Sequence, residues 1–431
     1  AASCSSPVSS ASTISGQVTL CASGLAGVAV TITHERFGAV STETDEEGNY
    51  AFYDVWSGAY TIMLSKEGVS FTPEERKITA AGGWIKDQDF IALPMWERKL
   101  GGEGVNRANS IRETADCGFI VAGYRQCTGS SKKALVVKLD PYGSVVWERT
   151  FGDTLDACAY DVEVTPDGGY VVAGSRQALD SLLDFWLLKL DGNGDTGSFG
   201  WSETYGGAFN DEAYSLQRTA DNGYIAAGYT TNGLAGMGDI HVMKVDEGGA
   251  LVGPEWPRTY GGEGWDADGG YIVAGYCSPL HTPRCVRLMK LDSMGNVEWN
   301  ELKSAGEWDE ARSVEETSDG GYIVAGYTRP LFGGTSSIWV MKTDSIGTID
   351  EELAPGTWSR IFSYEGAAEA YSAEETSDGG YIVSGSAYRR ESGSMEALVM
   401  KLDSKGALLW ERSFHAGDAT EANSIRETSD G

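Results

Sequence analysis

The chain has 431 residues, of which 41% are hydrophobic and 10% aromatic, so it can bury a sizeable core. Its 63 acidic and 33 basic residues give a net charge of −30, which opposes the neutralisation of phosphates that nucleic-acid binding requires. These numbers argue against nucleic acid and anionic membrane surfaces as partners, and no apolar run is long enough to span a membrane.

The first residues and the cysteines indicate an oxidising compartment. Residues 1–11 are small and Ser-rich, as in a tether, and the start Ala1-Ala2-Ser3-Cys4 has the form of a mature terminus after removal of a signal peptide. Seven cysteines fit secretion, because disulfides persist outside the cell. We therefore predict an extracellular or cell-surface location.

The positions of the cysteines predict three disulfides and leave one cysteine over. Cys277 and Cys285 flank a Pro-containing loop between two predicted strands, where a bridge would staple a hairpin. Cys127 ends one predicted strand, and Cys158 begins the next repeat. The predicted pairs are Cys4–Cys21, Cys127–Cys158 and Cys277–Cys285, with Cys117 unpaired. The alternative is that some of these residues are buried thiols.

Residues 12–93 alternate short strand-like runs with turn residues, a pattern typical of a β-sandwich. The segment Asp45-Glu-Glu-Gly48-Asn-Tyr50-Ala-Phe52, followed by Gly58-Ala-Tyr60-Thr-Ile62, resembles the characteristic turn of the carboxypeptidase-regulatory-like and Cna-B-like family. The resemblance covers nearly the whole of this segment. It implies a stalk or spacer domain on a secreted or surface protein.

A second pattern occupies residues 94–431, after Pro94, which cannot continue a β-ladder. Its hallmark is Asp319-Gly-Gly-Tyr-Ile-Val-Ala-Gly326, a glycine turn before a β-branched and aromatic run, which predicts a hairpin entering a buried strand. Further copies begin at Asp116, Asp167, Asp221, Asp268 and Asp378. Each copy closes on glycine, where we expect a neighbouring backbone to approach closely.

Tryptophans mark the period of this second pattern. They stand at positions 96, 147, 201, 256, 299, 358 and 410, about fifty residues apart, which is the length of a propeller blade. Four predicted strands joined by short turns lie between successive tryptophans. The repeats resemble a family of bacterial and archaeal secreted propellers with Asp-Gly-Gly-Tyr-Ile-Val-Ala-Gly and Lys-Leu-Asp motifs. We therefore predict an all-β fold, an N-terminal β-sandwich followed by a β-propeller of seven four-stranded blades.

Two repeats look incomplete in the sequence. Trp96 supplies a lone fourth strand and residues 422–431 a lone first strand, which would belong to a seventh blade without its middle strands. We expect the natural chain to continue beyond Gly431 with a Gly-Tyr-Ile-Val-like strand. The fourth repeat runs from Gly264 into Gly269 without its first strand, so either that strand is lacking or residues are omitted there. If both gaps are real, the open edges could accept strands from neighbouring molecules.

Two clusters are candidates for ligand binding. Asp191, Asn193 and Asp195 place oxygen atoms at alternate positions, as in a calcium loop, although equivalent turns elsewhere read as ordinary hairpins. Glutamates at the ends of the predicted first strands would form an acidic collar on one rim, and these are Glu113, Glu315, Glu316, Glu374, Glu375 and Glu427. The alternative for the collar is a solvated edge. We interpret the tryptophan and tyrosine stripes as sheet core.

These features favour a non-enzymatic protein with no assigned catalytic residue and no cofactor other than calcium. We hypothesise binding, adhesion or assembly, including filament formation, through the propeller faces or the exposed strand edges. The partners would be a protein or glycan at the cell surface, or further copies of the chain. Alternatives are an extracellular carbohydrate-active hydrolase that uses the acidic collar and a calcium-dependent ligand binder.

Overall fold

A computed structural model describes residues 11–101, 104–127, 129–152, 154–178, 182–197, 200–207, 209–231, 238–254, 256–260, 270–277, 284–306, 308–330, 334–415 and 420–428. All regular secondary structure in these ranges is β-strand, so the predicted all-β class is confirmed. Within them, no helix has the length and apolar character needed to cross a membrane. Most of the Ser-rich tether lies outside the described residues.

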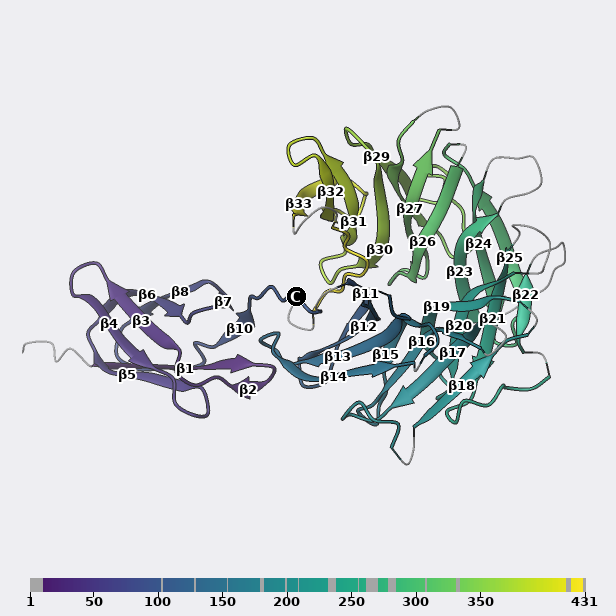
Figure 1. The fold of residues 1–431 in the computed structure, drawn as a ribbon. Coiled ribbons are helices and arrows are strands. Elements are labelled where there is room, and N and C mark those ends of the chain that lie inside the picture. Colours follow the sequence, from purple (N-terminus) through teal and green to yellow (C-terminus); the bar gives the residue numbers. More distant parts are fainter. Residues whose placement is uncertain are drawn as a thin grey trace, which may run out of the picture.

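Residues 12–94 form a β-sandwich of two sheets (Figure 1). One sheet is built around β1 (Ser12–Leu20) and also contains β2 (Ser23–Gly24), β5 (Asn49–Val55), β7 (Val69–Thr72), β9 (Gly83–Ile85) and β10 (Phe90–Pro94). The other has the order β4 (Gly38–Glu43), β3 (Ala29–His34), β6 (Gly58–Ser65) and β8 (Glu75–Ala80). Ile14, Val30 and Ile62 are fully buried between them, as the alternating pattern predicts.

Six further sheets follow in chain order, and in each of them consecutive strands pair antiparallel. Sheet 1 contains β11 (Val105–Glu113), β12 (Phe119–Gln126), β13 (Lys133–Leu139) and β14 (Val145–Phe151). Sheet 2 contains β15 (Ala157–Val164), β16 (Tyr170–Gln177), β17 (Leu183–Leu190) and β18 (Trp201–Tyr205). Sheet 3 contains β19 (Asp211–Arg218), β20 (Tyr224–Thr231), β21 (Gly238–Val245) and β22 (Arg258–Tyr260).

The remaining three sheets continue the same series. Sheet 4 contains β23 (Gly270–Cys277), β24 (Cys285–Asp292) and β25 (Val297–Lys303). Sheet 5 contains β26 (Trp308–Glu316), β27 (Tyr322–Arg329), β28 (Ser337–Thr343) and β29 (Trp358–Phe362), and sheet 6 contains β30 (Ala368–Glu375), β31 (Tyr381–Arg389), β32 (Ser394–Leu402) and β33 (Leu408–Phe414). Figure 1 shows the six sheets following one another around an arc, with their first strands toward the inside.

Sheet 4 has three strands among the described residues, where its neighbours have four. The sequence predicts a gap at this first strand. Residues 261–269, which precede β23, lie outside the described residues, so the two explanations of the gap stay open.

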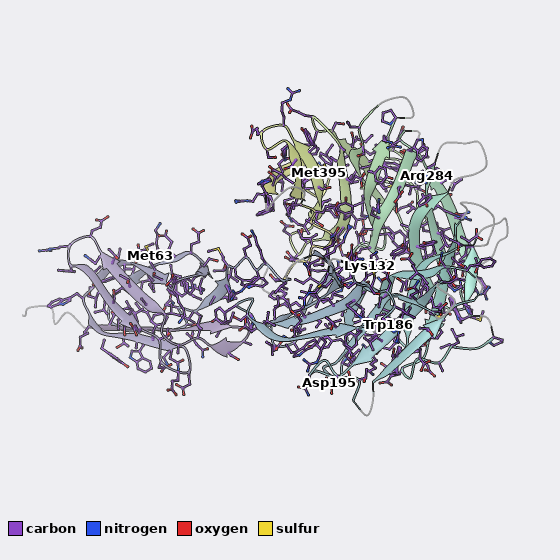
Figure 2. All side chains as sticks on the ribbon, viewed as in Figure 1. Met63, Lys132, Trp186, Asp195, Arg284 and Met395 are labelled. Atoms are coloured by element: carbon purple, nitrogen blue, oxygen red, sulfur yellow. A yellow bond between two sulfur atoms is a disulfide. The ribbon has the colours of Figure 1, made fainter. Side chains whose placement is uncertain are left out.

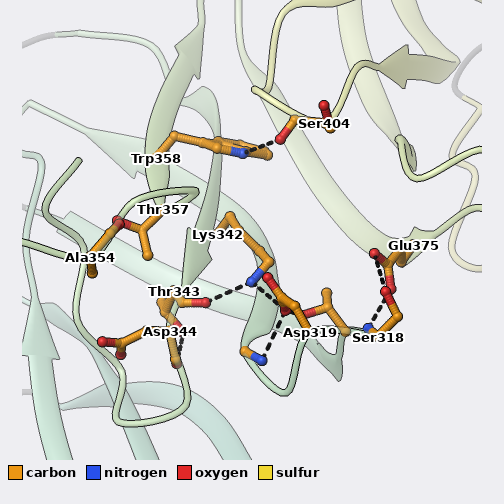
Figure 3. Close-up of polar contacts among 12 residues, drawn as sticks. Ser318, Asp319, Lys342, Thr343, Asp344, Ala354, Thr357, Trp358, Glu375 and Ser404 are labelled. Atoms are coloured by element: carbon orange, nitrogen blue, oxygen red, sulfur yellow. Dashed lines mark hydrogen bonds and ion pairs between the residues drawn. The ribbon is translucent and has the colours of Figure 1, made fainter. Parts of the chain in front are cut away.

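A buried lysine holds the turn between the first and second strands. In sheet 5, Lys342 is 2% exposed, and its Nζ donates to the Asp319 carboxylate at 2.9 Å and to the Thr343 carbonyl at 2.8 Å (Figure 3). The hydroxyl of Thr317 donates to the same aspartate at 2.7 Å. The equivalent ion pairs are Lys138–Asp116, Lys189–Asp167, Lys244–Asp221 and Lys401–Asp378. These contacts explain why the Lys-Leu-Asp and Asp-Gly-Gly motifs recur together.

Tryptophan side chains join each sheet to the next. The indole N–H of Trp358, on the last strand of sheet 5, donates to the Ser404 carbonyl in a turn of sheet 6 at 3.1 Å (Figure 3). The same contact is made by Trp96 to Pro141, Trp147 to Gly192, Trp201 to Glu247 and Trp299 to Ser345. Apolar side chains fill the space between neighbouring sheets, as Trp186 does between sheets 1 and 2 (Figure 2).

In five of the six copies of the repeat motif, the closing glycine lies under a neighbouring carbonyl, as predicted. A Cβ atom added to Gly326 would lie 2.0 Å from the Glu310 carbonyl oxygen of the first strand. The equivalent glycines Gly123, Gly174, Gly228 and Gly385 are equally close to a first-strand carbonyl. At each of these places the first strand contains an extra residue, a β-bulge.

Two of the three predicted disulfides are wrong. Cys21 is bonded to Cys117, with Cα atoms 5.9 Å apart, because the sandwich lies against the first turn of sheet 1; Cys4 lies outside the described residues. Cys127 is exposed after β12, whereas Cys158 is buried within β15, and both are free thiols. Cys285 is disulfide-bonded and stands directly opposite Cys277 in the β23–β24 ladder, as the third predicted pair requires.

Candidate functional site

The extra residue of each first strand lies at the inside of the arc. These bulge residues are Asn109, Tyr160, Tyr214, Arg312 and Tyr371. Asn423 takes the same place in segment 420–428, whose residues 422–428 repeat residues 108–114 exactly in sequence type. A bulge redirects its side chain out of the usual strand alternation. All six side chains line one cavity of about 750 Å³, together with Tyr229, Tyr276 and Glu310.

Tyrosines of sheets 2 and 3 form a continuous aromatic surface in this cavity. The ring centroid of Tyr214 lies 4.8 Å from that of Tyr160 and 5.7 Å from that of Tyr229, with which it is stacked. The hydroxyls of Tyr160 and Tyr229 donate to the two carboxylate oxygens of Glu212 at 2.7 and 2.9 Å. Burial, followed by the charge of Glu212, raises the pKa of Tyr229 to about 12, so its hydroxyl stays protonated near neutral pH.

Arginine and glutamate dominate the opposite side of the cavity. Glu310 accepts hydrogen bonds from the Tyr327 hydroxyl at 3.0 Å and pairs with Arg312 at 3.1 Å. The Arg312 guanidinium lies 5.6 Å from the ring centroid of Tyr327 and 5.8 Å from that of Tyr371, within the range of cation–π attraction. The cavity therefore combines aromatic faces with planar polar groups whose positions are fixed by their neighbours.

A second, smaller cavity of about 270 Å³ lies along the first strands, and ion pairs between arginine and acidic side chains lie beside it. Arg112 lies 3.2 Å from Asp161 and 3.5 Å from Glu163. Arg426 contacts Glu315 and lies 3.6 Å from Glu374. Burial raises the pKa of Glu163 and of Glu374 even though each has an arginine beside it. Arginines of the first and last segments thus compensate the inner glutamates.

The predicted acidic collar divides into two groups. Glu315 and Glu374 face inward and contact Arg426, as described above. Glu375 accepts hydrogen bonds from the backbone N–H and hydroxyl of Ser318 at 2.6 and 3.0 Å (Figure 3). Glu427 accepts the same two hydrogen bonds from Ser377. Glu316 is exposed, and Glu113 is partly buried. A ligand-binding role for these residues stays a prediction.

The Asp191 turn uses its oxygen atoms within the protein. The Asp191 carboxylate accepts the backbone N–H groups of Asn193 and Asp195 at 2.9 and 3.0 Å, and the Asp195 carboxylate lies 3.2 Å from Arg149. Asp140 and Asp403 make the same turn contacts in sheets 1 and 6. No group of three metal-ligating His, Cys, Asp or Glu side chains is found in the described ranges. Calcium binding at this turn stays a prediction.

The tyrosine cavity is the part of the site that the sequence interpretation missed. Tyrosines at the start of second strands, such as Tyr381, do pack between sheets, as expected for core residues. Tyr160, Tyr214 and Tyr371 do not follow that interpretation, because each is the extra residue of a bulge. The sequence did contain a signal for these bulges. Each of the three tyrosines directly follows an alanine that pairs with the closing glycine of the second strand.

The two ends of the series meet beside sheet 1 in a seventh position. Asn423 Nδ2 donates to the Ala108 carbonyl at 2.8 Å, as Asn109 Nδ2 does to the Ala159 carbonyl of the following sheet at 2.7 Å. Segment 420–428 therefore makes first-strand contacts, and Trp96 makes the last-strand contact to Pro141. No strand of the described residues lies between these two segments.

Trp410 faces this seventh position. Its side chain is 44% exposed, whereas Trp358, at the equivalent place in sheet 5, is 2% exposed. Phe414 on the same strand is 52% exposed. Among the described residues the indole N–H of Trp410 has no acceptor. The outer strand of sheet 6 is thus partly uncovered by the described residues.

Comparison with known proteins gives one family match. Residues 12–91 match the family model "BOS complex subunit NOMO1-like, second beta sandwich domain". This match supports the β-sandwich at the N-terminal part and does not extend to the six sheets. No curated protein sequence matches the chain.

One solved structure with similarity to this chain is a Bifidobacterium bifidum s17 protein provisionally assigned as an exo-beta-1,3-galactanase. The alignment has 11% identity and a TM-score of 0.32, and covers 60% of this chain and 91% of that one. We base no argument on a similarity of this size.

Proposed function

We propose that the six sheets are blades of a β-propeller and that the chain is a secreted or cell-surface protein of binding and assembly. A seventh blade would be started by segment 422–428 and ended by Trp96. The observation that carries this proposal is the exposed Trp410, because the other tryptophans of the series are buried or half-buried against a following sheet. A segment with an exposed strand edge, such as 422–428, can pair with an added strand, which is binding by β-augmentation.

A β-hairpin, supplied by the continuation of the natural chain or by another polypeptide, would fill the seventh position. Its first strand would pair with segment 422–428 and its second with the segment after Trp96. The chemistry of such a hairpin follows from the repeat, a Gly-Tyr-Ile-Val-like strand followed by a Leu-Val-Met-Lys-Leu-Asp-like strand. Its apolar face would cover Trp410 and Phe414.

Location outside the cell is the second part of this proposal. The Cys21–Cys117 bond and the oxidised Cys285 support an oxidising compartment. The sandwich would act as a stalk, since the disulfide and the linker after Pro94 attach it to sheet 1. Partners at the surface would be proteins or glycans, and they include further copies of the chain.

A synthetic hairpin tests the assembly role. We expect a fluorescent peptide with the sequence of residues 380–403, which contains no cysteine, to bind the protein and raise its fluorescence anisotropy. Trp410→Ala should weaken this binding, whereas Trp84→Ala, which removes a 67% exposed tryptophan of the sandwich, should not. Absence of binding, or equal loss in the two variants, would refute the proposal.

Extracellular hydrolysis is a second candidate function, favoured by one observation. Burial raises the pKa of Glu163 and of Glu374, and a general acid needs a raised pKa. Against this, both carboxylates are ion-paired to arginine. Release of reducing sugar from neutral polysaccharides, lost in Glu374→Gln, would support hydrolysis over binding.

A further inference from the structure

The bulge residues create a cavity whose size and lining are those of a small-molecule site. Its volume of about 750 Å³ falls within the range of ligand pockets, about 300–1,000 Å³. Residues of all six sheets and of segment 420–428 line it. We propose that this cavity binds an uncharged oligosaccharide. This inference does not depend on the assembly role, because the tyrosines, Glu310 and Arg312 of the cavity take no part in the seventh position, and only Asn423 belongs to both.

The arrangement of the aromatic rings favours a sugar over a quaternary ammonium group. A cage for such a cation needs rings held apart, with the cation within about 6 Å of each centroid. Here Tyr214 is in direct contact with Tyr160 and Tyr229, at centroid distances of 4.8 and 5.7 Å. The three rings therefore offer one continuous face rather than an enclosed space. Tyr214 and Tyr276 are 47% and 45% exposed, so their rings are accessible to the apolar C–H face of a pyranose.

Polar groups around this face suit hydroxyl groups. Glu310 and Arg312 line the cavity as an acceptor and a donor, and their ion pair holds both in place. The side-chain amide of Asn109 also lines the cavity. Its Nδ2 already donates to the Ala159 carbonyl, so its Oδ1 is the atom that can accept a hydrogen bond from a ligand. Sugars need such fixed pairs of donors and acceptors beside an aromatic surface, because each hydroxyl does both.

The charges near the cavity select against anionic sugars. Glu212 lies behind Tyr160 and Tyr229, Glu310 lines the cavity, and Glu369 lies 3.7 Å from Arg312. Arg312 pairs with Glu310 and Glu369, and Arg284 lies 3.4 Å from Glu310, so the charges of both arginines are offset by carboxylates. Together with the net charge of −30, these groups repel a uronate or sulfate.

Binding of neutral hexasaccharides tests this inference. The probes are cellohexaose, xylohexaose, mannohexaose and laminarihexaose, titrated into the full chain by isothermal calorimetry, with hexagalacturonate as the anionic probe. We expect at least one neutral probe to bind and hexagalacturonate to bind more weakly. Tyr214→Ala should weaken the affinity about tenfold, since one aromatic contact contributes up to about 1.5 kcal/mol and 1.4 kcal/mol corresponds to tenfold.

Two control variants separate stacking from a general defect. Tyr214→Phe retains the ring and should keep most of the affinity, which a loss of fold would not allow. Tyr142→Ala removes a 39% exposed tyrosine from a turn of sheet 1, outside the cavity, and should leave the affinity unchanged. The proposal is overturned if no neutral probe binds or if hexagalacturonate binds best. It is also overturned if Tyr142→Ala lowers the affinity as much as Tyr214→Ala, or if the protein binds the peptide of residues 380–403 but no sugar.

Discussion

Replacing the same repeat tryptophan in sheets 5 and 6 measures what a following sheet contributes. Trp358 is 2% exposed, its indole donates to Ser404 at 3.1 Å, and its ring meets Tyr381 edge-on at 5.5 Å. Truncation of a buried tryptophan costs about 3–5 kcal/mol of unfolding free energy, and the unpaired carbonyl adds about 1 kcal/mol. Trp410 is 44% exposed and has no such hydrogen bond, so Trp410→Ala should cost only about 1 kcal/mol.

The assay is urea unfolding followed by far-ultraviolet circular dichroism for the wild type, Trp358→Ala and Trp410→Ala. The two variants remove the same side chain from equivalent strands, so their difference isolates the packing of the next sheet. We expect Trp358→Ala to be the less stable by about 3–5 kcal/mol. The peptide of residues 380–403 should bury Trp410 in a packed interface. With the peptide bound, Trp410→Ala should therefore lose more unfolding free energy, and the difference between the two variants should become smaller. Equal losses without peptide would show that Trp410 is already covered in solution, and would refute the reasoning behind the open seventh position.

Three further predictions concern the disulfide, the inner charges and acid. Cys21 and Cys117 are 96 residues apart, so reduction of their bond should remove about 4–5 kcal/mol of unfolding free energy in the chain-entropy model. Dithiothreitol should therefore lower the melting temperature of the wild type more than that of Cys21→Ser/Cys117→Gly, which retains the disulfide of Cys285. Arg426→Ala should destabilise the chain at pH 7, because it leaves the buried Glu374 carboxylate without its arginine. The loss of stability should be smaller at pH 4, since burial raises the pKa of Glu374 and protonation removes its charge. The double variant Arg426→Ala/Glu374→Gln should recover part of the lost stability in calorimetry. The hydrogen bonds from Lys244 and Thr219 lower the pKa of Asp221 to about 2. The pKa of Asp319 is also lowered to about 2, because the hydrogen bonds from Thr317 and Lys342 outweigh the effect of its burial. The stability that these carboxylates contribute is therefore present above pH 4 and should be lost as the pH falls from about 4 to 2, which an acid titration by circular dichroism would record.

The strands and their repeat could be predicted because their signals are local. A glycine turn before Tyr322 and a buried run after it predict a hairpin without knowledge of any distant residue. The alternation of Ile14 and Val30 with polar residues likewise predicts the two faces of the sandwich. Even the close approach at Gly326 follows from the absence of a side chain in an otherwise β-branched strand.

The disulfide could not be predicted in the same way, because it depends on how two domains lie together. Cys117 replaces the glycine of the Asp-Gly-Gly turn and keeps a left-handed backbone, with φ of 52°. Cys21 has φ of 57° in the turn between β1 and β2. Non-glycine residues are uncommon in this region, so a cysteine at a glycine position was an available signal for a bond. Its partner nevertheless lies in the other domain, and spacing along the chain favoured nearer cysteines.

The closing glycine connects the repeat motif to the candidate site. A Cβ atom at Gly228 would lie 1.8 Å from the Glu212 carbonyl oxygen, so only glycine admits the first strand at that depth. The strand reaches this depth through its bulge, and the bulge residue is Tyr214. The same relation joins Gly174 to Tyr160 and Gly385 to Tyr371. At Gly275 of sheet 4, where no first strand is described, the nearest atom among the described residues would be Cδ1 of Ile240, 4.0 Å away. The motif that sets the period of the fold therefore also determines which first-strand residues can face a ligand, and the chain places tyrosine at three of those positions.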